Sequence, residues 1–170
     1  MTRTYQGHGP QIDKEAFIAE TAVLIGQVAV GARSSIWYGA VLRGDLDAIS
    51  VGEGTSVQDN AVLHCEKGSP VHIGNNVTIG HGAIVHGSTV GDNVLIGMGA
   101  VVLNGCTIGE NSIIAAGAVV KENAVIPAGS MVVGVPGKII RELSPEQVQK
   151  LQRESSYVRL SRSYLEEPGK

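Results

Sequence analysis

The sequence predicts a mainly β fold built on a six-residue repeat. An aliphatic residue returns at every sixth position over most of the chain, and a small residue stands two positions before most of these aliphatics. Side chains two apart on a strand point to the same side, so both sets are expected to face inward. Aromatic residues make up only 4% of the 170 residues and glycine occurs 23 times, which indicates a core of branched aliphatics.

The repeat has twenty positions, and each of them is Ile, Val or Leu: 12, 18, 24, 30, 36, 42, 51, 57, 63, 73, 79, 85, 90, 96, 102, 108, 114, 120, 126 and 132. Its phase slips in GDLDAIS (44–50), in CEKGSPVH (65–72) and near Ser88, so we expect loops or tight corners there. An antiparallel sandwich also has aliphatic strands, but its strands vary in length and irregular loops separate them. Twenty hexads that keep register therefore argue against a sandwich.

Gly or Asn occupies many of the intervening corners. A backbone that turns every six residues needs unusual dihedral angles there, which these two residue types tolerate best. The corner residues are Gly31, Gly52, Gly74, Gly91, Asn104, Asn111 and Asn123.

Hexads such as IGNNVT, IGHGAI and VGDNVL carry an aliphatic residue, a glycine and, at the fifth position, an aliphatic or small residue. This pattern resembles the left-handed parallel β-helix of the hexapeptide-repeat family, whose triangular coils take three hexads each. The resemblance covers residues 12–137, and GVPGK (134–138) resembles the loop at which many of these prisms end. We expect one domain over residues 1–170, with the β-helix at 12–137.

A C-terminal helix is expected over residues 144–165. Ser144 is suited to the N-cap, Pro145 to the first turn and Gln147 to a capping box. One apolar stripe should pack this helix on the prism, formed by Val148, Leu151, Val158 and Leu165. The EEPGK tail (166–170) is expected to fray.

Charge and composition limit the classes of partner and the compartment that we expect for this protein. A formal charge of −3 and a pI near 5.9 favour neither nucleic acid nor an anionic membrane. The first ten residues carry no apolar leader region and no apolar run could span a bilayer, so we expect a cytoplasmic protein. Cys65 and Cys106 are too few for a disulfide framework and are expected to be reduced, which fits that compartment.

One side of the predicted prism is apolar on the outside. With three hexads per coil, six stacked β-branched residues face outward on that side: Val23, Val41, Val62, Ile84, Val101 and Val119. Monomers rarely expose such a patch, so it should be an interface. The C-terminal helix could cover it instead, although one helix stripe is narrow against six coils. We predict a homo-oligomer, and the family resemblance makes it a trimer.

Three histidines lie at the borders of this side. His64 and His86 are three hexads apart, so they should stack one coil apart, at about 4.8 Å, with Arg43 in the same column. His81 lies at the opposite border, about 16 Å from His86 by extended-chain spacing. Zinc–imidazole bonds are about 2.0–2.1 Å long, so one chain cannot bring all three rings to one metal ion. A ring of three chains can bring the three histidines together, because it sets the His64 and His86 border of one chain against the His81 border of its neighbour.

Three imidazoles without a fourth protein ligand leave a position open for water, which is typical of catalytic zinc. Taken singly, each histidine would be read as an ordinary surface residue. We assign His8 and His72 to the surface, and strand alternation sends Cys65 to the other side of the strand, away from the metal.

Arg43-Gly44-Asp45, Gln58-Asp59, His64 and His81-x4-His86 together resemble the γ-class carbonic anhydrases and their bacterial homologues. The resemblance implies that the three histidines hold zinc and that zinc-bound hydroxide attacks CO2 to give bicarbonate, reversibly. It further implies the roles of five other residues: Gln58 hydrogen-bonds the hydroxide or bicarbonate, Arg43 pairs with Asp59 across the subunit interface, Asp45 holds Arg43, and Tyr157 leans toward the metal. As alternatives, Arg43, Asp45 and Asp59 only lock the trimer, and Tyr157 only packs the helix.

The chain departs from the best-known archaeal member of this class, which carries an acidic loop near its first histidine. Here that loop is the short CEKGSP (65–70), and Leu46 follows Asp45 where the archaeal protein has a glutamate. Fast CO2 hydration needs a group that carries protons away, so we expect weak or latent activity unless Glu66 turns inward.

The sequence is also compatible with other metal ions and with two other classes of function. Imidazole also suits Fe2+ and Co2+. An acyl-CoA thioesterase or acyltransferase is the second enzyme class, because trimeric hexapeptide folds also host CoA chemistry. A non-catalytic metal-binding scaffold is the third class.

Overall fold

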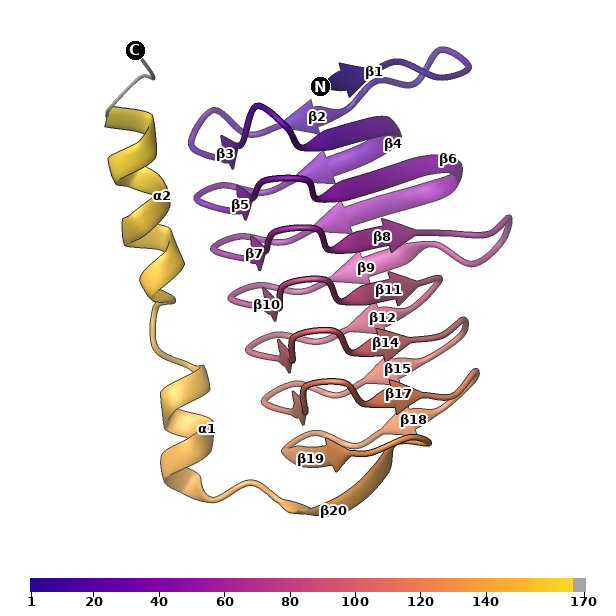
Figure 1. Cartoon of the computed structure of the whole chain (residues 1–170), viewed down its shortest axis with the longest axis vertical. Coiled ribbons are helices and arrows are strands. Elements are labelled where there is room, and N and C mark those ends of the chain that lie inside the picture. The colour runs from indigo at the N-terminus through magenta and orange to yellow at the C-terminus, as the bar shows by residue number, and fades with distance from the viewer. Residues whose placement is uncertain (167–170) are drawn as a thin grey trace.

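The computed structural model describes residues 1–166; residues 167–170, with most of the tail expected to fray, lie outside the described part. The chain winds into a parallel β-helix whose coils stack on one another, with two helices alongside (Figure 1). The mainly β fold predicted from the six-residue repeat is therefore confirmed.

The prism has three faces. The β8–β17 face contains the first parts of β4 (Val23–Val30) and β6 (Val41–Val51), then β8 (Val62–His64), β11 (Ile84–His86), β14 (Val101–Val102) and β17 (Val119–Val120). The β9–β18 face contains β2 (Gln11–Ile12), the ends of β4 and β6, β9 (Val71–Ile73), β12 (Thr89–Val90), β15 (Thr107–Ile108) and β18 (Val125–Ile126). The β3–β19 face contains β3 (Phe17–Ile18), β5 (Ser35–Ile36), β7 (Ser56–Val57), β10 (Thr78–Ile79), β13 (Leu95–Ile96), β16 (Ile113–Ile114) and β19 (Ser130–Val133).

Two further strands lie at the ends of the prism. β1 (Thr2–Arg3) pairs in parallel with β4. After the GVPGK turn, β20 (Lys138–Glu142) pairs antiparallel with β19, so the chain reverses where the parallel coils end.

The core consists of the aliphatic positions of the repeat. All twenty except Ile12 and Ile18 are buried, and so are most of the small residues two positions before them. Ile12 and Ile18 lie in the first coil, which has a stacked coil on one side only (Figure 1). The inward-facing assignment is otherwise confirmed.

The first phase slip is a bulge rather than a loop. Strand β6 runs unbroken through 44–50, and its pairing with β4 sets Gly44 beside Gly26 and Ile49 beside Val28. Four residues of β6, 45–48, thus face the single residue Gln27. This bulge projects Asp45 and Leu46 from the corner, and Leu46 is 54% exposed.

The corner residues fall into two groups. Asn111 and Asn123 have left-handed backbones, with φ of 55° and 60°, as expected. Asn104 and the four corner glycines have ordinary φ values, so that part of the expectation is wrong. The glycines instead permit close stacking of successive corners, since a Cβ on Gly52 would lie 2.5 Å from the carbonyl oxygen of Gly74.

The predicted C-terminal helix is present as two segments, α1 (Pro145–Leu151) and α2 (Ser156–Glu166), with a break at 152–155. The Ser144–Gln147 capping box is formed, as predicted. The predicted stripe is only partly right, since Val158 is buried but Leu165 is 48% exposed.

Aromatic contacts hold α2 on the first coils of the β3–β19 face. Tyr164 packs its ring 5.3 Å from Phe17 and 5.3 Å from Trp37, and Tyr157 packs 5.7 Å from Trp37, measured between ring centroids. These rings do the packing that the predicted aliphatic stripe assigned to Leu165.

An asparagine ladder anchors the break between the helices. The Asn76 side-chain amide donates to the carbonyl oxygens of Leu151 (2.7 Å) and Arg153 (3.2 Å), and to Asn93 Oδ1 (3.0 Å). These contacts satisfy carbonyl groups that a helix end leaves without partners. Asn76 thus holds the end of α1 and the first part of the break against the prism.

Replacing Asn76 by Gly should loosen this break. Glycine accepts the left-handed backbone at this position (φ 52°), so the change removes the side-chain contacts without adding strain. Two lost hydrogen bonds of about 1 kcal/mol each, about 2 kcal/mol together, should speed tryptic cleavage after Arg153 about thirtyfold, because the open state becomes more populated. Asn123→Gly, at another left-handed corner, is the control and should leave the cleavage rate unchanged; equal rates for both variants would contradict the anchoring role.

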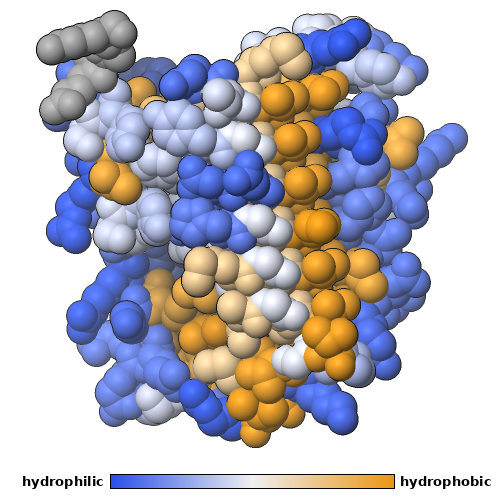
Figure 2. Space-filling view, in the orientation of Figure 1, coloured by the Kyte–Doolittle hydropathy of each residue, from blue (hydrophilic) through white to orange (hydrophobic). Residues whose placement is uncertain are grey.

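The apolar column predicted on the outside of the prism is present and uncovered. Its six residues pair in register from β4 to β17: Val23, Val41, Val62, Ile84, Val101 and Val119. The space-filling view shows this column as a continuous apolar stripe (Figure 2). The helices pack beside another face, where α2 contacts β3 and β5, so they do not cover the stripe.

Neither described helix has the length and apolar character that a bilayer crossing would require.

Candidate functional site

The first part of the candidate site is a stacked column at the end of the β8–β17 face. Arg43, His64 and His86 occupy equivalent positions on β6, β8 and β11, as the repeat predicts. The two imidazole rings lie 4.8 Å apart between centroids and 67° apart in plane, and His64 Nδ1 is 2.8 Å from His86 Nε2. Both rings are half-buried beside the apolar column.

Asp45 lies between the arginine and the first histidine. Its carboxylate accepts from Arg43 Nη1 at 2.6 Å and from His64 Nε2 at 3.1 Å, and the bulge in β6 places it there. Partial burial by itself raises the pKa of Asp45, but the hydrogen bonds from Arg43 and His64 outweigh burial and lower it. Burial lowers the pKa of His64 more strongly than its bond to Asp45 raises it, so the imidazole is neutral at pH 7.

Asn104 supports the second histidine. Its side-chain oxygen forms a short hydrogen bond with His86 Nδ1. The six-residue repeat marks Asn104 only as a corner residue and gives no direct sign of this contact. The available signal was its place in the next coil: Val85 pairs with Val102, so Asn104 stands one residue beyond the position equivalent to His86.

The second part of the site lies at the opposite border of the same face. His81 precedes strand β11, whereas His86 ends it. His81 Nδ1 lies 2.8 Å from Asp59 Oδ2, and 46% of the His81 side chain is exposed. Within one chain Asp59 therefore pairs with His81, and Arg43 pairs with Asp45.

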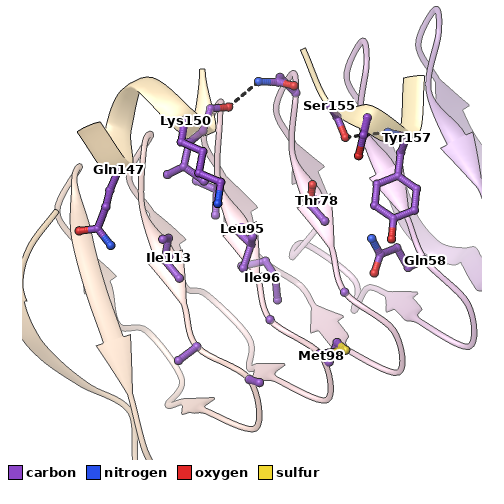
Figure 3. Close-up of a pocket in the computed structure, with 18 of the residues that line it drawn as sticks. Gln58, Thr78, Leu95, Ile96, Met98, Ile113, Gln147, Lys150, Ser155 and Tyr157 are labelled. Carbon is purple, nitrogen blue, oxygen red and sulfur yellow. Dashed lines mark hydrogen bonds between the residues drawn. The ribbon is translucent and has the colours of Figure 1, made fainter. Parts of the chain in front are cut away.

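A groove of 780 Å3 runs from His81 along the β3–β19 face beneath α1. Gln58, which is 5% exposed, and Tyr157 line the end near His81, and Figure 3 shows the Tyr157 ring reaching toward Gln58. Aliphatic side chains line the rest, including Leu95 and Ile113 (Figure 3). Tyr157 thus both packs on Trp37 and faces the groove.

The donor set suits a metal ion. His64, His81 and His86 each have one ring nitrogen held by a carboxylate or amide oxygen, which is how metal-binding histidines are usually oriented. With protons on those nitrogens, the remaining nitrogens of His64 and His86 turn lone pairs toward each other at 2.8 Å, an arrangement that a cation would stabilise. Within residues 1–166 of a single chain, no three His, Cys, Asp or Glu side chains are placed to hold one metal ion.

The remaining residues singled out in the sequence lie away from the two clusters. His8 and His72 are exposed, and His72 Nδ1 contacts Ser50 Oγ at 2.8 Å. Cys65 is fully buried, and its thiol donates to the carbonyl oxygen of Asp47 at 3.0 Å. Cys65 belongs to the core inside the prism, as strand alternation predicts, and burial raises the pKa of its thiol. Glu66 is exposed in the turn closed by the Glu66–Ser69 bridge.

Comparison with known proteins places this geometry in a family. The family model described as "Bacterial transferase hexapeptide (six repeats)" matches residues 87–122. A Methanocaldococcus jannaschii protein named "Probable carbonic anhydrase" is 51% identical over 88% of this chain and 95% of its own length. "Gamma carbonic anhydrase 1, mitochondrial" of Arabidopsis thaliana is 44% identical over 95% of this chain, which spans 61% of that longer protein.

Among solved structures, a hexapeptide transferase family protein from Anaplasma phagocytophilum superimposes with a TM-score of 0.92 at 42% identity, over 96% of this chain and 97% of that one. The coil is thus the left-handed β-helix of the hexapeptide repeats. The chain belongs to the γ-class carbonic anhydrase-like proteins of the hexapeptide-repeat family.

Proposed function

We propose that the protein is a zinc-dependent carbonic anhydrase of the γ class, which interconverts CO2 and bicarbonate. One observation carries the proposal. The three histidines each have one nitrogen oriented by an oxygen acceptor and one left for a metal, and they are divided between the two borders of an uncovered apolar face. The family membership supports a metal cofactor of this kind.

The proposed assembly is a homotrimer closed through the β8–β17 face. Six half-buried or exposed aliphatic residues in one column favour burial against a second chain. A closed ring would set His64 and His86 of one chain against the His81 border of its neighbour. Each trimer would then contain three sites.

Zinc held by three imidazoles makes a bound water acidic enough to act as a nucleophile near neutral pH. The chain's own residues orient and polarise the substrate around it. Gln58 would hydrogen-bond CO2 or bicarbonate with its side-chain amide. Asp45 and Asp59 orient two of the histidines, Arg43 would meet Asp59 across the subunit interface, and Tyr157 would contribute its hydroxyl near Gln58.

We expect turnover to be weak. Glu66, the one acidic residue in the short loop after His64, is exposed, in the turn closed by its bridge to Ser69. Without a fixed group to receive the proton, proton transfer to buffer limits the rate. The protein is expected to act in the cytoplasm, as two buried, unpaired cysteines are typical of reducing compartments.

Stopped-flow CO2 hydration by the zinc-loaded protein tests the proposal. We expect a rate above that of buffer which increases with buffer concentration and is lost with chelator. Hydration no faster than buffer, with zinc fully bound, would reject the activity and leave a metal-binding scaffold. Loading with Fe2+ or Co2+ in parallel determines which metal supports turnover best.

A second candidate function uses a CoA thioester as substrate, either transferring its acyl group to an acceptor or hydrolysing it. The groove favours it, because 780 Å3 lined by aliphatic side chains far exceeds what CO2 needs and ends at Gln58 and His81. Lys150 on its rim could meet an anionic group (Figure 3). Release of free CoA thiol from acetyl-CoA or decanoyl-CoA, in the absence of CO2 hydration, would favour this function over the first.

A further inference from the structure

We propose that Asn104 is a positioning residue for the metal site, which fixes the His86 ring so that Nε2 is the metal-binding nitrogen. The proposal rests on the proposed metal site and deepens it. It concerns a residue outside the motif that identifies the family in the sequence. The first observation is that His86 Nδ1 is hydrogen-bonded to Asn104 Oδ1.

The hydrogen bond determines where the ring proton lies. An amide oxygen only accepts, so His86 Nδ1 must carry a proton to form the bond. In the neutral imidazole the other nitrogen, Nε2, then carries the lone pair. That nitrogen faces His64 at 2.8 Å and lies on the side of the column where the two rings meet.

The backbone holds Asn104 in this position independently of any metal. Its carbonyl oxygen accepts from the Asn123 backbone N–H at 2.8 Å, and the next residue, Gly105, donates to the Gly87 carbonyl oxygen at 2.8 Å. Asn104 also has an ordinary backbone φ, so a substitution there adds no left-handed strain. The stacked corner therefore presents the amide oxygen to His86 before a metal binds.

A close approach next to His86 restricts the position further. A Cβ on Gly87 would lie 2.9 Å from Asn104 Oδ1, so only glycine leaves room for the amide beside the histidine. Asp45 and Asp59 perform the corresponding task for His64 and His81, and with Asn104 every histidine of the site has an oxygen acceptor. The His86 partner is neutral, which keeps the number of carboxylates at the site to two.

Zinc affinity of Asn104 variants tests the proposal. Asn104→Leu removes the acceptor at nearly constant size and should weaken zinc binding by roughly 10–100-fold, as loss of a supporting hydrogen bond to a metal-binding histidine typically does. Asn104→Asp keeps an acceptor oxygen and should bind zinc within about threefold of the wild type. Affinities are measured by competition with a chromophoric chelator, on protein whose oligomeric state and melting temperature match the wild type.

Nitrogen-15 NMR of the imidazole groups gives a readout that does not depend on zinc. In metal-free wild-type protein the His86 proton should reside on Nδ1, and in Asn104→Leu it should redistribute toward Nε2. If Asn104→Leu does not assemble, Asn104→Ala removes the same acceptor without steric conflict and decides the outcome.

Two failures are distinguishable. A wild-type protein that binds no zinc would overturn the proposed function itself. A wild-type protein that binds zinc, with Asn104→Leu or Asn104→Ala binding equally tightly and the proton still on Nδ1, would overturn only the role of Asn104.

Discussion

Co-assembly of two zinc-free variants, His64→Ala and His81→Ala, is expected to restore about a quarter of the wild-type zinc sites, the fraction given by random assortment in a closed ring of three. Each variant alone should lose tight zinc binding. A mixed ring always contains one junction where an intact His64 and His86 meet an intact His81. Three quarters of the rings are mixed, and each mixed ring has one intact site in three.

The variants suit this experiment because neither ring belongs to the hydrophobic core inside the prism. His81 is about half exposed in the single chain, and His64 lies at the surface end of β8 with a 14% exposed side chain. The two chains carry different affinity tags and are refolded together, and zinc is measured in the whole mixture, where about a quarter of the sites should be filled, and in the double-tagged rings, where about a third should be filled. His72→Ala, which removes an exposed histidine from the β9–β18 face, is the control and should retain full zinc. No zinc in double-tagged rings would contradict a shared site.

The double substitution Val101→Asp and Val119→Asp should convert the proposed trimer to monomers and thereby remove zinc. Both residues belong to the apolar column, one and two coils beyond His86, at about 4.8 Å per coil. Burying an unpaired carboxylate costs several kcal/mol, and a ring of three chains would bury six of them. Neither residue is one of the three proposed ligands, so zinc loss here would be expected to follow from dissociation of the ring.

Light scattering and zinc content are the measurements. The matched control is Thr107→Asp, which places a carboxylate at an exposed position of β15 on a different face. The control should remain trimeric and keep its zinc. The proposed interface would be wrong if the double variant remained trimeric, or if it became monomeric and still bound zinc tightly.

The β-helix could be predicted from the sequence because the same six-residue period determines which side chains face the core and which strands pair. The inward aliphatics, the apolar column and the register of Arg43, His64 and His86 all follow from counting in sixes, and the structure confirms each. The helix break at 152–155 could not be predicted, since it depends on Asn76, about 75 residues earlier in the chain.

The site was predictable in part. Its histidines can be found in the sequence because His64 and His86 occupy equivalent positions in successive coils. Their hydrogen-bond partners cannot, because these come from corners, where the six-residue period does not predict the direction of a side chain. Asp45 is placed by a bulge that the sequence only indicates as a phase slip, and Asn104 reaches His86 from a corner that was assigned a backbone role. Asp59 contacts His81 within one chain, and its expected pairing with Arg43 of a neighbouring chain stays a prediction.

The turn after His64 shows how such a scaffold can change its chemistry. His64 and His86 are paired although the coil between them is longer than eighteen residues, because the surplus is looped out and closed at its base by Glu66 and Ser69. The length of this loop is therefore uncoupled from the positions of the ligands. A longer, acidic loop could be inserted here without moving either histidine, so reaction rate and metal geometry can evolve separately in this chain.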